Sequence, residues 1–268
     1  MTVDLFLDSG AFTAHTKGTK IDICEYTKFA EKHAPLINVI SSLDHITSWK
    51  KSLSNLTISN LSVPTIPCFH YGEPFDLLQM YVNSFPYIAL GGLIISGYTK
   101  FIPWLDECFG KYICDKNGYP KIKVHGFAVT SQKIMFRYPW YSVDSSTWLR
   151  VSRMGMILIP KKINNVYRFD MSPIRIQVSS KGPMKNQADF HLDHMARIEY
   201  RKVKKYVKER GFKFGKSKIV DGKETILKKG LRNSYSLRDK FNILYMLDLE
   251  KALPKWPSKF SQKEGYLL

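Results

Sequence analysis

Two short segments place an aspartate directly after an apolar run, and each aspartate could carry chemistry. Asp8 follows residues 3–7 and opens the sequence Asp-Ser-Gly-Ala, while Asp144 ends residues 140–144 and precedes two serines. Parallel strands that form a barrel gather such residues at one face, where barrel enzymes work. Two carboxyl groups brought together there can act as a nucleophile and a general acid/base. Either could instead cap a helix or close a turn, because Asp-Ser sequences favour both.

The elements that must position these aspartates are short apolar segments, which recur along residues 1–180. We predict eight strands, at residues 3–7, 36–42, 64–69, 87–91, 121–127, 141–144, 155–159 and 173–178. Apolar residues at helical spacing predict helices at 22–33 and 74–83, with shorter candidates at 105–112 and 131–138. Strands that alternate with helices predict an α/β fold with a parallel sheet, and eight such units predict closure into a (β/α)8 TIM-like barrel.

The composition becomes more basic after about residue 180. Residues 197–232 carry fourteen lysines and arginines against four acidic residues. Residues 197–210 have the apolar spacing of an amphipathic helix, residues 211–230 are typical of a hairpin or an ordered basic loop, and a second helix is expected at 237–251. We therefore predict a catalytic barrel at 1–180 and a basic, mainly helical C-terminal extension at 181–268, packed on the barrel.

Charge and cysteine usage narrow the class of protein. The 268 residues carry a net charge of +18, which favours a polyanionic partner, with nucleic acid ahead of an anionic membrane. A basic surface that only aids solubility is the alternative. The four cysteines form no CxxC pair, no signal peptide opens the sequence, and no apolar run could cross a bilayer. These features predict a cytoplasmic protein with no membrane partner; the oligomeric state is left open.

Five motifs then point to a known family. They are DSGAF at 8–12, SLDH at 42–45, IALGGL at 88–93, KVHGFAVT at 123–130 and SVDSSTW at 142–148. In order and rough spacing they resemble the corresponding segments of the tRNA-guanine transglycosylases, over residues 1–160. That resemblance implies a barrel enzyme that replaces a guanine base on an intact sugar.

Two departures from the family shift the expected substrate. The family has a zinc site of three cysteines and a histidine after its nucleophile, but no cysteine follows Cys114 here. We therefore expect no cofactor, with zinc unlikely. The short, basic chain most resembles the phage DNA-guanine transglycosylases, which insert a 7-deazaguanine base such as preQ0 into DNA. That resemblance implies DNA and a free 7-deazaguanine as partners, in a host cytoplasm if the protein is phage-encoded.

The resemblance also assigns the two aspartates. Asp144 is expected to attack the sugar C1′ and hold a covalent Asp-deoxyribose intermediate, following the logic of a retaining glycosidase. Asp8 is expected to protonate the departing guanine and then to deprotonate the incoming base.

Six further residues are expected to bind the base. They are Asp44, His70, Gly91, Gly92, Phe12 and Tyr98. The Asp44 carboxylate can accept N1–H and N2–H of guanine, His70 can reach O6 or the 7-substituent, and the glycines allow a close approach of backbone N–H groups. Phe12 and Tyr98 could stack on a flipped base. The alternatives are a helix cap at Asp44, a structural His70, a tight turn at the glycines and core positions for the aromatic rings.

The basic segment is expected to contact phosphates, which gives affinity without reading sequence. The residues concerned are Arg197, Arg201, Lys202, Lys204, Lys205, Lys208, Arg210, Lys213, Lys216 and Lys218. Four interleaved aromatic residues, Tyr200, Tyr206, Phe212 and Phe214, could stack on bases, or could instead pack on the barrel beneath a solvated helix. His125 is expected in the barrel interior, and His191 and His194 have a metal-ligand spacing but no further ligand nearby.

The leading hypothesis is exchange of guanine in DNA for a 7-deazaguanine, with the target base flipped out or single-stranded. The same exchange on tRNA is the nearest alternative. A base-removing glycosylase and a non-catalytic nucleic-acid-binding protein on the same fold are the others.

Overall fold

The structure is a computed structural model that describes residues 4–58, 61–92, 98–179, 181, 190–220 and 223–260. The chain forms two compact units. The first comprises Met1–Val129, Arg137–Asp144 and Lys255–Leu268, and the second comprises Thr130–Phe136 and Ser145–Pro254. The division therefore falls near residue 145 instead of the boundary predicted at residue 180.

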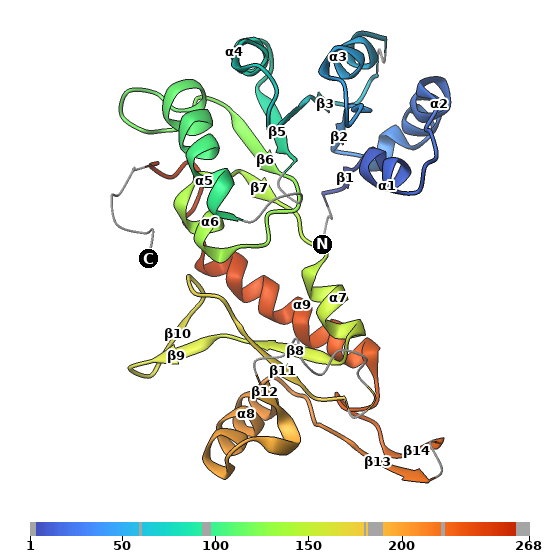
Figure 1. The fold of residues 1–268 in the computed structure, drawn as a ribbon, viewed down its shortest axis with the longest axis vertical. Helices are drawn as coiled ribbons and strands as arrows, with labels where there is room; N and C mark the ends of the chain where they lie inside the picture. Colours follow the sequence, from blue (N-terminus) through green and yellow to red (C-terminus); the bar gives the residue numbers. More distant parts are fainter. Residues whose placement is uncertain are drawn as a thin grey trace. The chain divides into compact units, whose positions relative to one another are not determined.

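The first unit holds two parallel sheets, β1–β3 and β4–β7, whose strands follow one another in chain order (Figure 1). The strands are β1 (Phe6–Leu7), β2 (Val39–Ser41), β3 (Thr65–Ile66), β4 (Cys68–His70), β5 (Tyr87–Gly91), β6 (Lys123–Gly126) and β7 (Ser142–Val143). β3 pairs with β2 and β4 with β5, so the extended segment from Thr65 to His70 joins two sheets at Pro67. Because proline has no N–H to donate, it interrupts the ladder there. The alternation of strands and helices confirms the predicted α/β class.

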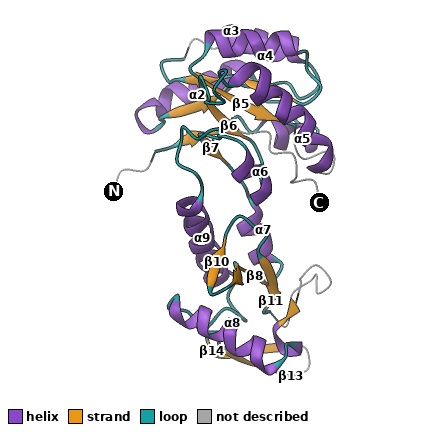
Figure 2. Cartoon of the chain, turned by 90° about the vertical axis from the view of Figure 1, so that its left-hand side faces the viewer, coloured by secondary structure: helices purple, strands orange, loops and turns teal. Residues whose placement is uncertain are grey.

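Helices connect these strands and pack against the sheets. They are α1 (Ala11–Thr16), α2 (Ile23–His33), η1 (Ala34–Leu36), α3 (Trp49–Ile58), α4 (Phe75–Ser84), α5 (Tyr98–Glu107) and η2 (Cys108–Ile113). Asp22 caps α2 by accepting the N–H groups of Cys24 and Glu25. Figures 1 and 2 both place α3 and α4 on the outer side of the strands.

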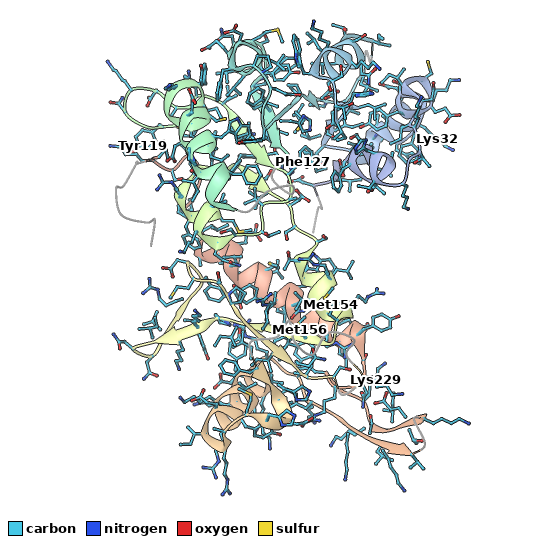
Figure 3. The ribbon with its side chains drawn as sticks, viewed as in Figure 1. Lys32, Tyr119, Phe127, Met154, Met156 and Lys229 are labelled. Atoms are coloured by element: carbon cyan, nitrogen blue, oxygen red, sulfur yellow. The ribbon has the colours of Figure 1, made fainter. Side chains whose placement is uncertain are left out.

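Side chains of β1 and β6, one strand from each sheet, meet. The Phe6 ring on β1 stacks on the His125 ring of β6 at 4.5 Å between centroids. Phe127, which is labelled in Figure 3, packs edge-on against both. Ile66, Cys68 and Ala89 fill the layer beside them. In the described part of the chain, no pairing between β1 and β7 joins the two sheets into a closed barrel.

The prediction of eight parallel strands is wrong for the last two. β8 (Met156–Ile159) and β11 (Ile174–Gln177) lie at the predicted positions, but they pair with each other antiparallel and belong to the second unit. Between them, β9 and β10 form a hairpin whose two turn residues, Asn164 and Asn165, both have positive φ. That turn chemistry reverses the chain, where a barrel would need a helical crossover.

The second unit packs helices against this sheet, in which β8 and β11 are antiparallel and the edge strand β12 (Phe190–His191) pairs parallel with β11. Its other elements are α6 (Gln132–Arg137, whose last residue belongs to the first unit), α7 (Thr147–Arg153), β9 (Lys161–Ile163), β10 (Val166–Arg168), η4 (Leu192–His194), α8 (Arg197–Glu209), β13 (Lys216–Val220), β14 (Lys223–Lys228) and α9 (Tyr235–Ala252). α8 and α9 confirm two predicted helices, and β13–β14 is the hairpin expected within 211–230.

A buried asparagine ties α9 to its neighbours. Asn242 is fully buried; its Oδ1 accepts the N–H of Leu158, and its Nδ2 donates to the carbonyls of Trp148 and Met156. One side chain therefore links α9, α7 and β8. All four cysteines are free, and within the described residues no helix is both long and apolar enough to span a membrane.

Candidate active site

Polar residues follow the carboxyl ends of the parallel strands of the first unit. Asp8 comes after β1, Asp44 after β2, His70 ends β4, Gly91 ends β5 and Asp144 follows β7. Because neighbouring parallel strands end at the same edge of a sheet, these residues share that edge. The two predicted catalytic aspartates therefore lie at the same edge as Asp44, His70 and Gly91, three of the six predicted base-binding residues.

The pKa of the Asp8 carboxyl is shifted by burial and by two other carboxylates, those of Asp44 and Asp144. Burial raises the pKa of Asp8 most, and the negative charges of Asp44 and Asp144 raise it further, while N–H groups of Gly10 and Ser9 oppose the shift. Although part of the Asp8 surface is open to solvent, its carboxyl lies among enough protein atoms to lose hydration. A carboxyl with a raised pKa is suited to hold a proton and give it to a leaving group.

The Asp144 side chain is held by a backbone N–H group of the loop after β6, and not by the helix α7 that follows it. Its Oδ1 accepts the N–H of Ala128 at 2.7 Å, and 56% of the side chain is open to solvent. Ala128 has a φ of 55°, a left-handed conformation that costs an alanine about 1 kcal/mol. The alternative of a helix cap is wrong for Asp144, because the N-cap of α7 is Ser146.

His125 lies in the interior, as the sequence predicts, and its ring also lies beside Asp144. Its Nε2 is buried and lies 3.5 Å from Asp144 Oδ1, while its Nδ1 is 2.7 Å from Ser142 Oγ. Ser142 Oγ is in turn 2.6 Å from the Tyr87 hydroxyl. The chain of contacts across β5, β6 and β7 fixes the imidazole beside Asp144. The signal available in the sequence was the alternation of the KVHG strand, which puts Val124 and His125 on opposite faces.

Asp44 and His70 form a half-buried ion pair at this edge. His70 Nε2 is 2.8 Å from Asp44 Oδ2, and His70 Nδ1 is 3.5 Å from Glu73 Oε1. Burial alone would lower the pKa of His70, but Cys68, Asp44 and Glu73 together outweigh burial and raise it. Because burial raises the pKa of the Cys68 thiol to about 11, that thiol is neutral at pH 7 and the two carboxylates hold the imidazole protonated.

This pairing bears on both predicted base contacts. Asp44 does not cap a helix, since α3 begins at Trp49; its Oδ1 instead accepts the Ser9 hydroxyl at 3.1 Å. Each carboxylate oxygen can accept a second hydrogen bond, so Asp44 retains capacity for a base edge. Both ring nitrogens of His70 already face carboxylates, so this side chain would have to leave one of them to contact a base.

The glycines after β5 are needed for packing as well as for access. A Cβ on Gly91 would lie 2.8 Å from Cys68 Sγ and 3.0 Å from His70 Cδ2, and Gly92 has a φ of 81°. Phe12 lies on α1 with 43% of its surface exposed, so it is no core residue. The side chain of Tyr98 lies outside the described residues.

Among the residues that the structure describes, one group of side chains could hold a metal ion. Asp44, Cys68 and His70 each offer a ligand atom, and these atoms lie within 4.8 Å of one another. Carboxylate, thiolate and imidazole are ligands that zinc accepts. In the structure Asp44 and His70 satisfy each other as an ion pair, which accounts for their closeness without a metal.

Most of the residues predicted to contact phosphates are exposed to solvent. Nine of the ten cationic residues are exposed; Arg210 is half-buried and pairs with Asp248. On α8, Lys202 pairs with Glu199 and Lys205 with Glu209 at the surface. Such exposed pairs contribute about 0–1 kcal/mol and yield readily to a phosphate.

The four interleaved aromatic residues pack within the second unit instead of lying free. Tyr206 is buried, Tyr206 and Phe212 both meet the Phe241 ring edge-on, and Tyr200 stacks on Phe214. The alternative of core aromatics beneath a solvated helix is therefore the correct one, except that they pack on α9 and the antiparallel sheet. His191 Nδ1 accepts the N–H of Asp193, and His194 lies beside it.

Comparison with protein-family models, with curated proteins and with solved structures gave no match for this chain.

Proposed function

We propose that the protein is a DNA-guanine transglycosylase, which exchanges guanine in DNA for a 7-deazaguanine such as preQ0. The observation that supports it most is that Asp8, whose pKa is raised chiefly by burial, also feels the negative charge of the accessible Asp144 carboxylate. One group is thereby suited to carry a proton and the other to attack, which is the division of labour that base exchange needs.

The proposed reaction has two balanced halves. Asp144 attacks C1′, the bond from C1′ to N9 breaks, and Asp8 gives its proton to the departing guanine. The incoming 7-deazaguanine then loses its N9 proton to Asp8 and attacks C1′, which releases Asp144 as a carboxylate. His125 orients the Asp144 carboxylate, and Asp44 accepts the donors of the guanine edge, which both substrate and product carry.

Replacement of the proposed nucleophile is the first test. We expect Asp144→Asn to abolish incorporation of labelled guanine into DNA, because the amide cannot attack C1′, while DNA binding stays within about twofold. Asp76→Asn, an exposed aspartate on α4, is the matched control and should exchange guanine normally. Normal exchange by Asp144→Asn would remove this residue from the mechanism.

The nucleic-acid substrate is decided in the same assay by offering DNA and tRNA in parallel. Exchange confined to tRNA would replace the proposed substrate but keep the chemistry. A base-removing glycosylase is the second candidate, because the exposed Asp144 side chain leaves a sugar bound there open to water. Abasic sites that form without any added 7-deazaguanine would favour that activity.

A further inference from the structure

A basic hollow of about 200 Å³ lies wholly within the second unit. Its lining includes Arg153, Arg232 and Arg238, together with Lys181, and a single acidic side chain, Glu224. At about 30 Å³ per water, the volume holds roughly six or seven waters, or one tetrahedral oxyanion with bridging waters. None of these residues belongs to the candidate active site.

Arg238 brings a buried positive charge to the hollow without a carboxylate to balance it directly. The residue is 6% exposed; its Nε donates to the Ser152 carbonyl at 2.8 Å and its Nη1 to the Leu231 carbonyl at 2.7 Å. No carboxylate of the described residues lies within ion-pair distance of its guanidinium. Burial lowers the pKa of Arg238, while the more distant charges of Asp239 and Glu224 act in the opposite direction. A buried guanidinium paired only with carbonyls gains from a nearby anion.

Of the other two arginines, only Arg153 adds a positive charge that no carboxylate of the described residues compensates. Arg153 is exposed and lies over the Tyr235 ring at 4.4 Å, again with no carboxylate partner among the described residues. Arg232 differs, because Asp193 takes two of its N–H groups and compensates its charge. Arg153 is therefore free to turn its fork towards an anion while its ring contact holds it at the rim.

We propose that this hollow binds an oxyanion of the phosphate class, with Arg153 and Arg238 as its charged ligands. Arginine presents planar N–H pairs that match two oxygens of a phosphate, and such charge-assisted bonds are about twice as strong as neutral ones. Glu224 opposes the anion, and it lies 3.9 Å from Lys181 Nζ, which partly offsets its charge. The inference does not depend on the base exchange proposed above.

The test titrates inorganic phosphate into the intact protein by calorimetry, at constant ionic strength with chloride replaced. We expect saturable binding, and we expect Arg153→Gln to weaken it by about tenfold to a hundredfold, the range for a lost charge-assisted hydrogen bond. Arg150→Gln, an exposed arginine on the same helix that does not line the hollow, is the matched control and should bind as the parent does. Arg153→Lys, which keeps the charge but not the fork, should fall between them.

Two further arms separate the sources of the phosphate group. If the ligand is a backbone phosphodiester, a short DNA strand without terminal phosphate should bind more weakly to Arg153→Gln and be displaced by inorganic phosphate. If it is a phosphate monoester, a nucleoside 5′-monophosphate should show that behaviour and the DNA strand should not. Absence of saturable phosphate binding by the parent, or equal losses in Arg153→Gln and Arg150→Gln, would overturn the site.

Discussion

At the scale of single residues, the candidate site depends on the pH at which Asp8 loses its proton. Burial and two neighbouring carboxylates raise its pKa, so its charged form costs the folded protein more than it costs the unfolded chain. The folded protein therefore loses stability as pH rises from the ordinary pKa of 3.8 through the raised pKa of Asp8. This penalty is the cost of keeping a proton donor beside Asp144.

Asp8→Asn should separate this penalty from catalysis. The neutral amide avoids burying a charge, so we expect a higher unfolding temperature than the parent at pH 8, and a smaller gain at pH 4, near the ordinary pKa of 3.8. Exchange should fall by a factor of roughly 10² or more, the usual general acid/base contribution. Thermal unfolding at both pH values, with Asp76→Asn as control, measures the first effect. An equal change at the two pH values would contradict a raised pKa.

At the scale of elements, local turn chemistry decides which strands join which sheet. The positions of β1, β2, β5 and β6 could be predicted because short apolar runs reveal buried strands. The fate of β8 and β11 could have been predicted from Asn164 and Asn165, since two consecutive residues that tolerate positive φ are typical of a hairpin. The break at Pro67 was equally visible in the sequence, but which partner each half would take was not.

The candidate site was predictable to a similar extent and for a similar reason. Asp8, Asp44 and Asp144 each follow a strand, so their shared edge follows from a parallel sheet. The pairing of Asp44 with His70, and the approach of His125 to Asp144, depend on side-chain packing between strands distant in sequence. No local pattern encodes those distances, which is why His125 was assigned to the interior alone.

Asn242 should prove to be the polar residue that holds α9 in place. Asn242→Ala leaves one buried N–H and two buried carbonyls without their partner, and each such group costs about 1–3 kcal/mol. We expect a loss of about 2–4 kcal/mol in the free energy of unfolding, measured in urea. Asn83→Ala, at an exposed position on α4, should change stability by less than about 0.5 kcal/mol. A comparable loss in both variants would contradict the role of Asn242.

At the scale of the whole molecule, positive charge is concentrated in the second unit while the strand-end carboxylates belong to the first. Exposed lysines are frequent on α8 and on β13–β14, and aromatic residues between them pack into the core of the second unit. Binding through such a surface reads phosphates and not bases. Affinity for nucleic acid should therefore depend strongly on salt.

Neutralising Lys202, Lys204, Lys205 and Lys208 to glutamine should reduce that dependence. Each phosphate contact contributes about 0.9 to the slope of log affinity against log salt on duplex DNA, so the slope should fall by up to about 3.6. The control variant carries the same change at four exposed lysines of the first unit, Lys28, Lys32, Lys50 and Lys51. Its net charge equals that of the α8 variant, and its slope should match that of the parent. An unchanged slope in the α8 variant would show that this helix does not touch phosphates.

The first unit is discontinuous in sequence, and this has a consequence for how it is made. Phe260 packs on Phe109 and Tyr138, and its N–H donates to the Gly118 carbonyl. A ribosome synthesises residues 145–254 of the second unit before it adds Phe260. The sheet that bears Asp8 emerges first and yet acquires this last piece only after the inserted unit has been synthesised. During translation, Phe109 and Tyr138 therefore lack their contact with Phe260 until more than a hundred further residues have been added.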